Sequence, residues 1–305
     1  MINKFYELQI EIEPSCILDC VHCSSLETRS KSTLINEKDL IKLISMFKSG
    51  VHIYFTGGEP LLKKDILNLF QSITYENPNA IIGVYTTGNL NDMLPISETM
   101  ALNMKNSGVF DCYFSIYSNS QIEHDAWTRS PGSFENTIAS IHNTIGVGIH
   151  SKAHIVLNKH NCTKIDELID FCASLGLEEI RILKLSPSGA AIYNWSNIGI
   201  PSGEQDFIIS KLIKSQGERL PKLTFSGYPS LYPCRALPGA IGCQAGARLL
   251  YIDIDGDVYP CACAKASAER YRIGNLEHLN DIINYIKSVE GVSHYTNCLN
   301  EGFEM

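Results

Sequence analysis

Short apolar runs of strand length alternate with longer helical patterns over the first two-thirds of this 305-residue chain. The strand-like runs lie at residues 7–13, 52–56, 81–86, 112–117, 153–157 and 180–185. The helical patterns, with apolar residues three and four positions apart, lie at residues 37–48, 64–74, 92–106, 133–144 and 165–175. Parallel neighbours need crossover connections, so six consecutive strand–helix units predict an α/β fold with a parallel sheet and helices outside it.

Such a sheet gathers the loops at the carboxyl ends of its strands on one rim, where ligands bind. The loops that this rule places together are residues 16–23, 57–60, 86–89 and 186–189. Any chemistry in the first two-thirds of the chain is therefore expected at this rim.

The pattern changes in the last third of the chain. Residues 193–203 are rich in Ser, Gly and Asn and indicate a linker, and an amphipathic helix is predicted near residues 204–216. Asp255-Gly256 lies between alternating apolar residues, which predicts a hairpin of residues 249–253 and 257–259. A closing helix is predicted near residues 280–289. We expect three regions, at residues 1–190, 191–230 and 231–305.

Composition excludes several classes of function. The formal net charge of −8, without a run of Lys and Arg, argues against a nucleic-acid ligand. No apolar run approaches the roughly 20 residues that span a bilayer, and the first residues lack the form of a signal peptide. We therefore expect a cytoplasmic protein, in which an odd count of 11 cysteines favours metal ligation over disulfides.

Three cysteines follow the first predicted strand with the spacing C-x3-C-x2-C, at Cys16, Cys20 and Cys23. Thiolates are soft ligands that suit iron–sulfur clusters or zinc. Three thiolates leave one iron of a [4Fe–4S] cluster open for a substrate or cofactor. A zinc site needs a fourth ligand, and the only local candidate is His22, where simultaneous binding with Cys23 is awkward. Both alternatives stay open on these residues alone.

This loop resembles the signature of the radical S-adenosylmethionine (radical SAM) superfamily, with His22 at its usual aromatic position. The sequence Thr56-Gly57-Gly58-Glu59-Pro60 is similar to the Gly-Gly-Glu-Pro motif of that family, which holds the amino group of S-adenosylmethionine. Paired glycines allow close approach of the backbone to a ligand, and Glu59 can accept charge-assisted hydrogen bonds from an ammonium.

The resemblance implies a partial (β/α)6 TIM-like barrel. It also implies S-adenosylmethionine bound to the open iron, its reductive cleavage to a 5′-deoxyadenosyl radical, and an electron donor such as flavodoxin or ferredoxin. Further cofactor contacts implied in this way are Asn89 after the third strand, Ser115 on the fourth and Leu185 after the sixth.

The C-terminal cysteines resemble the SPASM and twitch extensions found on part of this family. Cys243, Gly256 and Cys261 match the C-x9–15-G-x4-C signature, but the second half of a full SPASM domain is missing. The resemblance therefore implies one auxiliary [4Fe–4S] cluster, with Cys243, Cys261, Cys298 and Cys234 as ligands. Cys263 either replaces Cys234 or is a free thiol that donates a hydrogen atom to a substrate radical. A four-cysteine zinc ribbon is the alternative for this region.

Residues 115–134, with His124-Asp125, Thr128 and Gly132-Ser133-Phe134, resemble the family members that modify peptides. We therefore expect an enzyme that modifies an unactivated carbon of a ribosomally made peptide, by cross-linking or epimerisation. There is little room for a leader-binding module before the first strand, so a separate recognition protein or the barrel itself is expected to bind the leader. The alternatives are a dehydrogenase or epimerase of a small molecule, such as an aminocyclitol or sugar, and a zinc-stabilised interaction protein.

Overall fold

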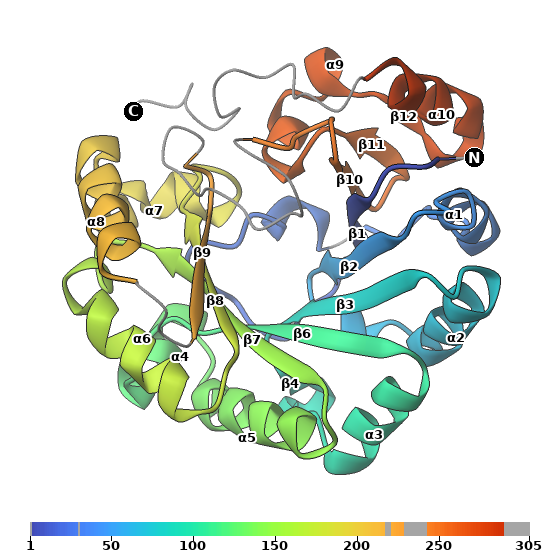
Figure 1. The fold of residues 1–305 in the computed structure, drawn as a ribbon. Helices are drawn as coiled ribbons and strands as arrows, with labels where there is room; N and C mark the ends of the chain where they lie inside the picture. The colour runs from blue at the N-terminus through green and yellow to red at the C-terminus, as the bar shows by residue number, and fades with distance from the viewer. Residues whose placement is uncertain (1, 30, 217–220, 229–242, 290–305) are drawn as a thin grey trace.

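The computed structural model describes residues 2–29, 31–216, 221–228 and 243–289, and its central feature is one ten-stranded sheet. The strand order is β12-β11-β10-β1-β2-β3-β6-β7-β8-β9. The strands from β10 to β9 in this order pair in parallel, whereas the β10–β11 and β11–β12 pairs are antiparallel. Figure 1 shows the strands curving around a common centre with the helices on the outside.

The elements have the following bounds. The strands of the large sheet are β1 (Tyr6–Glu13), β2 (Val51–Gly57), β3 (Ala80–Thr86), β6 (Val109–Ser115), β7 (His150–Leu157), β8 (Glu179–Lys184), β9 (Lys222–Ser226), β10 (Leu249–Ile252), β11 (Asp257–Tyr259) and β12 (Gly274–Asn275). The α-helices are α1 (Glu37–Ile44), α2 (Ile66–Glu76), α3 (Glu98–Asn106), α4 (Gln121–Thr128), α5 (Ser133–Gly146), α6 (Ile165–Ser174), α7 (Ala190–Ile198), α8 (Ser202–Ser215), α9 (Ala268–Tyr271) and α10 (Leu279–Ser288). The short strands β4 (Asn89–Leu90) and β5 (Leu94–Pro95) form a separate hairpin. The 3-10 helices are η1 (Leu26–Thr28), η2 (Pro60–Leu62), η3 (Asn91–Met93), η4 (Cys162–Lys164), η5 (Ala262–Ser267) and η6 (Leu276–His278).

The parallel sheet with outer helices that the sequence predicts is confirmed, with β1, β2, β3, β6, β7 and β8 as the six predicted strands. The hydrophobic core lies between the sheet and the helices and includes fully buried Ile10, Phe55 and Phe114 from the strands and Leu40 and Phe70 from the helices. The residues next to these core positions in each strand face the inside of the barrel, because side chains alternate along a strand. Within the described ranges, no helix combines the length and apolar character needed to cross a membrane.

The helix predicted at residues 92–106 begins later than expected. Asp92 and Met93 have positive φ angles of 58° and 52°, so the chain cannot start a right-handed helix there. The chain first forms the β4–β5 hairpin, and α3 then begins after Ser97, whose hydroxyl accepts a hydrogen bond from the Met100 amide.

The linker predicted at residues 193–203 is wrong over its first half, where α7 continues to Ile198. The helix buries Ala191 and Ile198, and the Asn194 side chain donates a hydrogen bond to the Val21 carbonyl oxygen at 2.8 Å. Contacts with the cysteine loop therefore outweigh a local composition typical of a linker.

Both edges of the predicted sheet gain strands beyond residue 190. On one side β9 pairs in parallel with β8, a strand that the sequence pattern did not reveal. On the other side the predicted C-terminal hairpin, β10 and β11, joins the sheet through β10, which runs parallel to β1 with Gln9 opposite Tyr251. The cysteine-rich end of the chain is thus built onto the strand that leads into the first cysteine loop (Figure 1).

Candidate functional site

The loop with the three N-terminal cysteines (residues 16–23) follows β1 and is held between α4 and α7. The amide of Val21 donates a hydrogen bond to the carbonyl oxygen of Trp127, at the end of α4, at 3.0 Å. The carbonyl oxygen of Cys23 accepts one from the amide of Ala190, the first residue of α7, at 2.9 Å. Backbone bonds on both sides therefore fix the loop at the carboxyl ends of the strands, on the predicted rim.

The three thiols share one largely apolar environment. Cys20 is buried, Cys16 and Cys23 are partly buried, and all three lie in a hydrophobic cluster that includes Leu185. Burial raises the pKa of Cys16 to about 12, and the nearby Glu59 carboxylate adds to this effect. Burial also raises the pKa of Cys20, with contributions from Cys16 and Cys23. Cys16 and Cys20 therefore keep their protons until a metal binds and displaces them.

The chemistry of this donor set fits an iron–sulfur cluster. Across the described ranges, no three His, Cys, Asp or Glu side chains are placed to hold one metal ion together. The cysteine ligands of a [4Fe–4S] cluster bind different irons, so their sulfurs surround the cluster and do not meet at one point. Three soft ligands from one loop can thus hold a cluster and leave one iron without a protein ligand.

His22 is fixed by two aromatic rings. Its ring centroid lies 5.0 Å from that of Tyr117 and 5.3 Å from that of Trp127. The indole nitrogen of Trp127 donates a hydrogen bond to His22 Nδ1 at 2.8 Å, and burial lowers the pKa of His22 to about 4. The neutral ring therefore orders the cysteine loop, and its contact with a cofactor stays a prediction.

The Gly-Gly-Glu turn after β2 is bonded directly to the chain that enters the cysteine loop. The amide of Gly58 donates to the Glu13 carbonyl oxygen at 2.7 Å, and the amide of Glu59 donates to the Ser15 carbonyl oxygen at 2.8 Å. A Cβ atom on Gly58 would lie 2.1 Å from the Ser15 oxygen, so only glycine allows this approach. Gly57 has a φ of 136°, and a Cβ there would lie 2.2 Å from the Glu13 oxygen. The two predicted motifs therefore form one structural unit.

Glu59 is fully buried, and protein groups already occupy its carboxylate. One oxygen accepts hydrogen bonds from the Thr86 hydroxyl at 2.8 Å and the Leu61 amide at 3.3 Å. The other accepts bonds from the amide and the hydroxyl of Thr87, both at 2.8 Å. Burial raises the pKa of Glu59 even though these bonds favour the charged form. Glu59 thus ties the ends of β2 and β3 together, a role beside which its predicted bond to the cofactor ammonium stays a prediction.

The other predicted cofactor contacts lie around the same rim in different settings. The Asn89 amide is fully buried and donates to Thr137 Oγ1 of α5 at 3.1 Å, so its nitrogen supports the fold. Ser115 ends β6 and lies on the inner face, because Phe114 belongs to the core outside the sheet. Leu185 packs in the hydrophobic cluster of the cysteine loop. Their contacts with a cofactor stay predictions.

Aromatic side chains fill the inner face of the sheet below this rim. The rings of Tyr54 and Tyr85 stack with centroids 4.5 Å apart, and those of Tyr113 and His154 stack at 4.4 Å. The guanidinium of Arg181 lies 4.4 Å from the Tyr113 centroid and donates hydrogen bonds to the hydroxyls of Tyr85 at 3.1 Å and Tyr113 at 2.7 Å. These side chains close the barrel from within.

Charged groups lie beside these aromatic side chains, near the amino ends of the strands. We call the aromatic and charged side chains on the inner face of the sheet the floor of the barrel. Asp111, fully buried, accepts hydrogen bonds from Lys152 and His52, the latter at 3.3 Å. Burial alone would raise the pKa of Asp111, but His52 and Lys152 together hold it below its usual value. Glu179 forms a similar pair with Arg181 at 3.6 Å. Carboxylates and cations therefore offset each other inside the barrel.

Arg29 is a residue of the site that the sequence patterns did not reveal. It follows η1; burial would lower the pKa of Arg29, but its interactions with Cys23, Cys16 and Cys20 raise it. It also forms an ion pair with Asp19 at 3.3 Å. No spacing rule links Arg29 to the cysteines, although it is the first cation after them in the sequence.

The C-terminal cysteines are described only in part. Cys243, Cys261 and Cys263 are partly buried, whereas Cys234 and Cys298 lie outside the described residues. Cys261 follows β11 and packs in a small apolar cluster with Tyr251 of β10. Their predicted roles, as cluster ligands and for Cys263 as a hydrogen-atom donor, stay predictions.

An ion pair joins this region to the first strand. Both carboxylate oxygens of Glu11, on β1, accept hydrogen bonds from Lys265 Nζ, at 2.9 and 2.8 Å. The Ser25 hydroxyl, just beyond Cys23, donates to the same carboxylate at 3.4 Å. Glu11 is buried and therefore links the cysteine loop, the first strand and the segment after Cys263.

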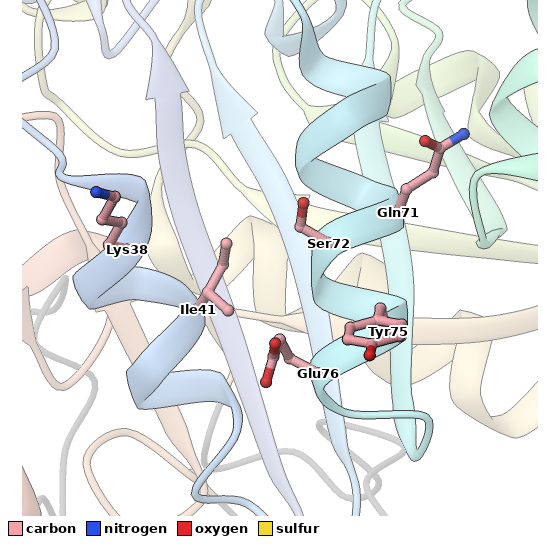
Figure 2. Close-up of a pocket in the computed structure, with 6 residues that line it drawn as sticks. All are labelled: Lys38, Ile41, Gln71, Ser72, Tyr75 and Glu76. Atoms are coloured by element: carbon pink, nitrogen blue, oxygen red, sulfur yellow. The ribbon is translucent and has the colours of Figure 1, made fainter.

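A pocket of about 520 Å³ lies away from this rim, between α1 and α2. Figure 2 shows its lining, with Lys38 and Ile41 on α1 and Ser72 and Tyr75 on α2. The cysteines and the Gly-Gly turn do not line it. It therefore takes no part in the candidate site.

Two family profiles match the chain. The profile of the radical SAM superfamily matches residues 10–172, a little over half of the chain. The profile of the SPASM iron–sulfur cluster-binding domain matches residues 243–298, a segment that begins at Cys243 and ends at Cys298. Both matches favour iron–sulfur clusters over the zinc alternatives.

Individual proteins are similar over most of the chain. Mycofactocin maturase MftC of Mycobacterium ulcerans is 27% identical over 279 residues, which cover 87% of this chain and 70% of the relative. The AdoMet-dependent heme synthase of Nitratidesulfovibrio vulgaris is 25% identical over 272 residues, covering 82% and 72%. The chain spans about two thirds of the length of the maturases that it matches, down to 66% for MftC of Mycobacterium tuberculosis.

Solved structures share the fold. The structure of Streptococcus suis SuiB bound to the precursor peptide SuiA aligns with a TM-score of 0.68 at 18% identity. The alignment covers 96% of this chain and 68% of that chain. At this identity the likeness establishes the fold and carries no conclusion on substrate.

Proposed function

This chain belongs to the radical SAM superfamily, and from that premise we propose that it modifies an unactivated carbon of a ribosomally synthesised peptide. The product would be a cross-link or an epimerised residue. The observation that carries this proposal is the direct bonding of the Gly-Gly-Glu turn to Glu13 and Ser15, which lead into the three-cysteine loop at the rim of the barrel. The similarity to mycofactocin maturase MftC over 87% of the chain supports a role in maturation, and we propose a peptide as the substrate.

Different residues of the rim would bind the cluster and S-adenosylmethionine. Cys16, Cys20 and Cys23 would hold the cluster of the family, and the backbone of Gly57 and Gly58 would approach S-adenosylmethionine closely. When bound, the cluster supplies the electron that cleaves S-adenosylmethionine to a 5′-deoxyadenosyl radical. The stacked aromatic rings on the inner face of the sheet would keep water away from the reacting atoms, because they fill the barrel below the rim.

The C-terminal region would hold one auxiliary [4Fe–4S] cluster. Cys243, Cys261 and Cys298 are the ligands that we propose, with Cys234 or Cys263 as the fourth. If Cys234 is the fourth ligand, Cys263 would instead donate a hydrogen atom to the substrate radical. The extent of the SPASM match, from Cys243 to Cys298, supports this assignment.

Two protein partners complete the proposal. A flavodoxin or ferredoxin would deliver electrons, and a separate protein or the barrel itself would recognise the leader of the precursor peptide. We place the enzyme in the cytoplasm, and we propose boundaries near residues 190 and 230 between the barrel, a connecting region and the auxiliary-cluster region.

Mass spectrometry of a candidate peptide tests the substrate class. Anaerobically reconstituted enzyme, dithionite and S-adenosylmethionine would be incubated with a precursor peptide encoded beside this protein. The expected result is a mass change of a few daltons, or an unchanged mass with a D-residue on amino-acid analysis. Release of 5′-deoxyadenosine at the same rate with and without every peptide tried would contradict a peptide substrate.

A small-molecule substrate is the second candidate. The similarity to AdoMet-dependent heme synthase over 82% of this chain favours it. The name of this relative gives heme, a small molecule, as its product. Sugars, aminocyclitols and tetrapyrroles would be compared in the same assay. Stimulation of 5′-deoxyadenosine release by one of them, and by no peptide, would support this candidate.

A further inference from the structure

Glu11 lies between the two parts of the chain that carry the predicted metal ligands. Only 3% of its side chain is exposed, and both carboxylate oxygens accept hydrogen bonds from Lys265 Nζ, at 2.9 and 2.8 Å. One of these oxygens also accepts a hydrogen bond from the Ser25 hydroxyl at 3.4 Å. A buried carboxylate that loses its cation keeps an uncompensated charge, so the place of Glu11 depends on Lys265.

Lys265 lies in a short helix whose start is set by Cys261. Cys261 directly precedes η5, and its carbonyl oxygen accepts a hydrogen bond from the Ala264 amide at 3.1 Å. Ala264 is fully buried and packs in the apolar cluster that contains Cys261 and Tyr251. Lys265 is the next residue in the chain. A metal that fixes the Cys261 sulfur therefore restricts the backbone that carries the Lys265 ammonium.

Ser25 holds the other end of this connection. It lies two residues after Cys23, is buried and directly precedes η1. Its carbonyl oxygen accepts hydrogen bonds from the amide of Thr28 at 3.1 Å and from the Thr28 hydroxyl at 2.9 Å. Two short stretches of chain and the hydrogen bonds of one buried carboxylate therefore join Cys261 to Cys23.

A second contact joins the same two parts of the chain without Glu11. The Leu34 amide donates a hydrogen bond to the Ile254 carbonyl oxygen at 2.7 Å, and Lys31 pairs with Asp255 at 3.2 Å. The side chains of Lys31 and Asp255 are half-exposed, so their ion pair is weak. Lys31 is therefore a matched comparison for Lys265, because it bridges the same two parts from an exposed position.

We propose that Lys265 is a positioning residue, through which metal bound at Cys261 orders the end of the N-terminal cysteine loop. Lys265 acts through the Glu11 carboxylate on Ser25 and η1. Coupling between two binding sites is reciprocal, so metal bound at the N-terminal cysteines orders η5 in turn. The proposal rests on the proposed metal binding by Cys261, and not on the identity of the substrate.

Hydrogen exchange followed by mass spectrometry tests this proposal without substrate, on the full chain reconstituted without oxygen. In Cys261→Ala, we expect the amides of residues 24–28 to exchange about tenfold faster than in the native protein, because η5 is no longer fixed. In a Lys265→Met background, where the connection is already broken, Cys261→Ala should add less than about threefold. In a Lys31→Met background, its full effect should remain. Lys265→Arg should keep the native exchange rate at residues 24–28, because it preserves the cation beside Glu11.

Iron and sulfide analysis accompanies each exchange measurement. A Cys261→Ala variant that loses iron but keeps native exchange at residues 24–28 would overturn the proposal, and so would an equal effect of Cys261→Ala in the Lys265→Met background. Native iron content in Cys261→Ala would instead contradict the ligand assignment under the proposed function, which separates the two failures. In that case, or if Cys261→Ala does not fold, Lys265→Met and Lys31→Met are compared directly. Equal exchange at residues 24–28 in these two variants would also overturn the proposal.

Discussion

At the scale of single residues, the structure of the rim depends on glycine at a position that has no space for a side chain. Gly58 lies against the backbone of Ser15, so its backbone joins the second strand to the entry of the cysteine loop. Glu59 then fastens the same turn to Thr86 and Thr87 at the end of β3. The motif thus shapes the rim through backbone contact and a buried carboxylate.

Replacing Gly58 with alanine tests this role. The added Cβ would lie 2.1 Å from the Ser15 carbonyl oxygen, so the turn must move away from the cysteine loop. We expect Gly58→Ala to lose most N-terminal iron after anaerobic reconstitution, measured as iron and sulfide per chain. Gly203→Ala is the control, because a Cβ at this exposed position in α8 meets nothing within 4 Å. Full iron binding by Gly58→Ala would show that the contact is dispensable.

Residue roles could be predicted only where a local pattern carries them. The cysteine spacing and the Gly-Gly pair identify their own loops, and the structure brings these loops together. The bonds of Glu59 and Asn89 within the protein could not be predicted from sequence, because their contacts with Thr87 and Thr137 depend on packing between separate elements. Arg29 was missed for the same reason, since the path of the chain through η1 decides which groups raise its pKa.

At the scale of elements, the alternation of strands and helices was predictable because each half-buried strand and amphipathic helix shows its own period. The places of β9 and α7 were not, because tertiary contacts with β8 and the cysteine loop decide them. The C-terminal hairpin was predicted from Asp255-Gly256, but its pairing with β1 has no signal in the local sequence.

The ion pair between Glu11 and Lys265 should stabilise the attachment of this hairpin region. Lys265→Met leaves the buried carboxylate of Glu11 without its cation, and we expect the free energy of unfolding to fall by about 3 kcal/mol. Urea unfolding measures this change, and hydrogen exchange should accelerate in residues 261–271. Lys31→Met is the matched control, because its pair with Asp255 is exposed and is worth less than about 1 kcal/mol. Equal losses in both variants would contradict a special role for Glu11.

At the scale of the whole molecule, the barrel is closed from inside by paired charges and stacked rings. Asp111 with Lys152 and Glu179 with Arg181 lie where several strands meet. The floor therefore couples the stability of the barrel to the ionisation of its carboxylates.

Acid titration of stability tests the floor. The pKa of Asp111 is held below its usual value, so its contribution is present above the unfolded pKa of about 3.9 and is lost as the pH falls through the folded pKa. We expect Asp111→Asn to lower the free energy of unfolding by about 3–5 kcal/mol at pH 7, because Lys152 loses its buried partner. The difference from the native protein should shrink below about pH 4. An exposed control, Asp166→Asn, should show little change at any pH, and a constant deficit in Asp111→Asn would contradict the linkage.

One assay tests the whole account most directly. It measures 5′-deoxyadenosine formed by the native protein and by a variant in which Cys16, Cys20 and Cys23 are all changed to alanine. The native protein, reconstituted without oxygen, should contain about eight irons per chain and should cleave S-adenosylmethionine when reduced. The triple variant should keep about half of the iron, in the auxiliary site, and form no 5′-deoxyadenosine. Cleavage by the triple variant, or a native protein that binds no iron, would contradict the assignment of the three cysteines.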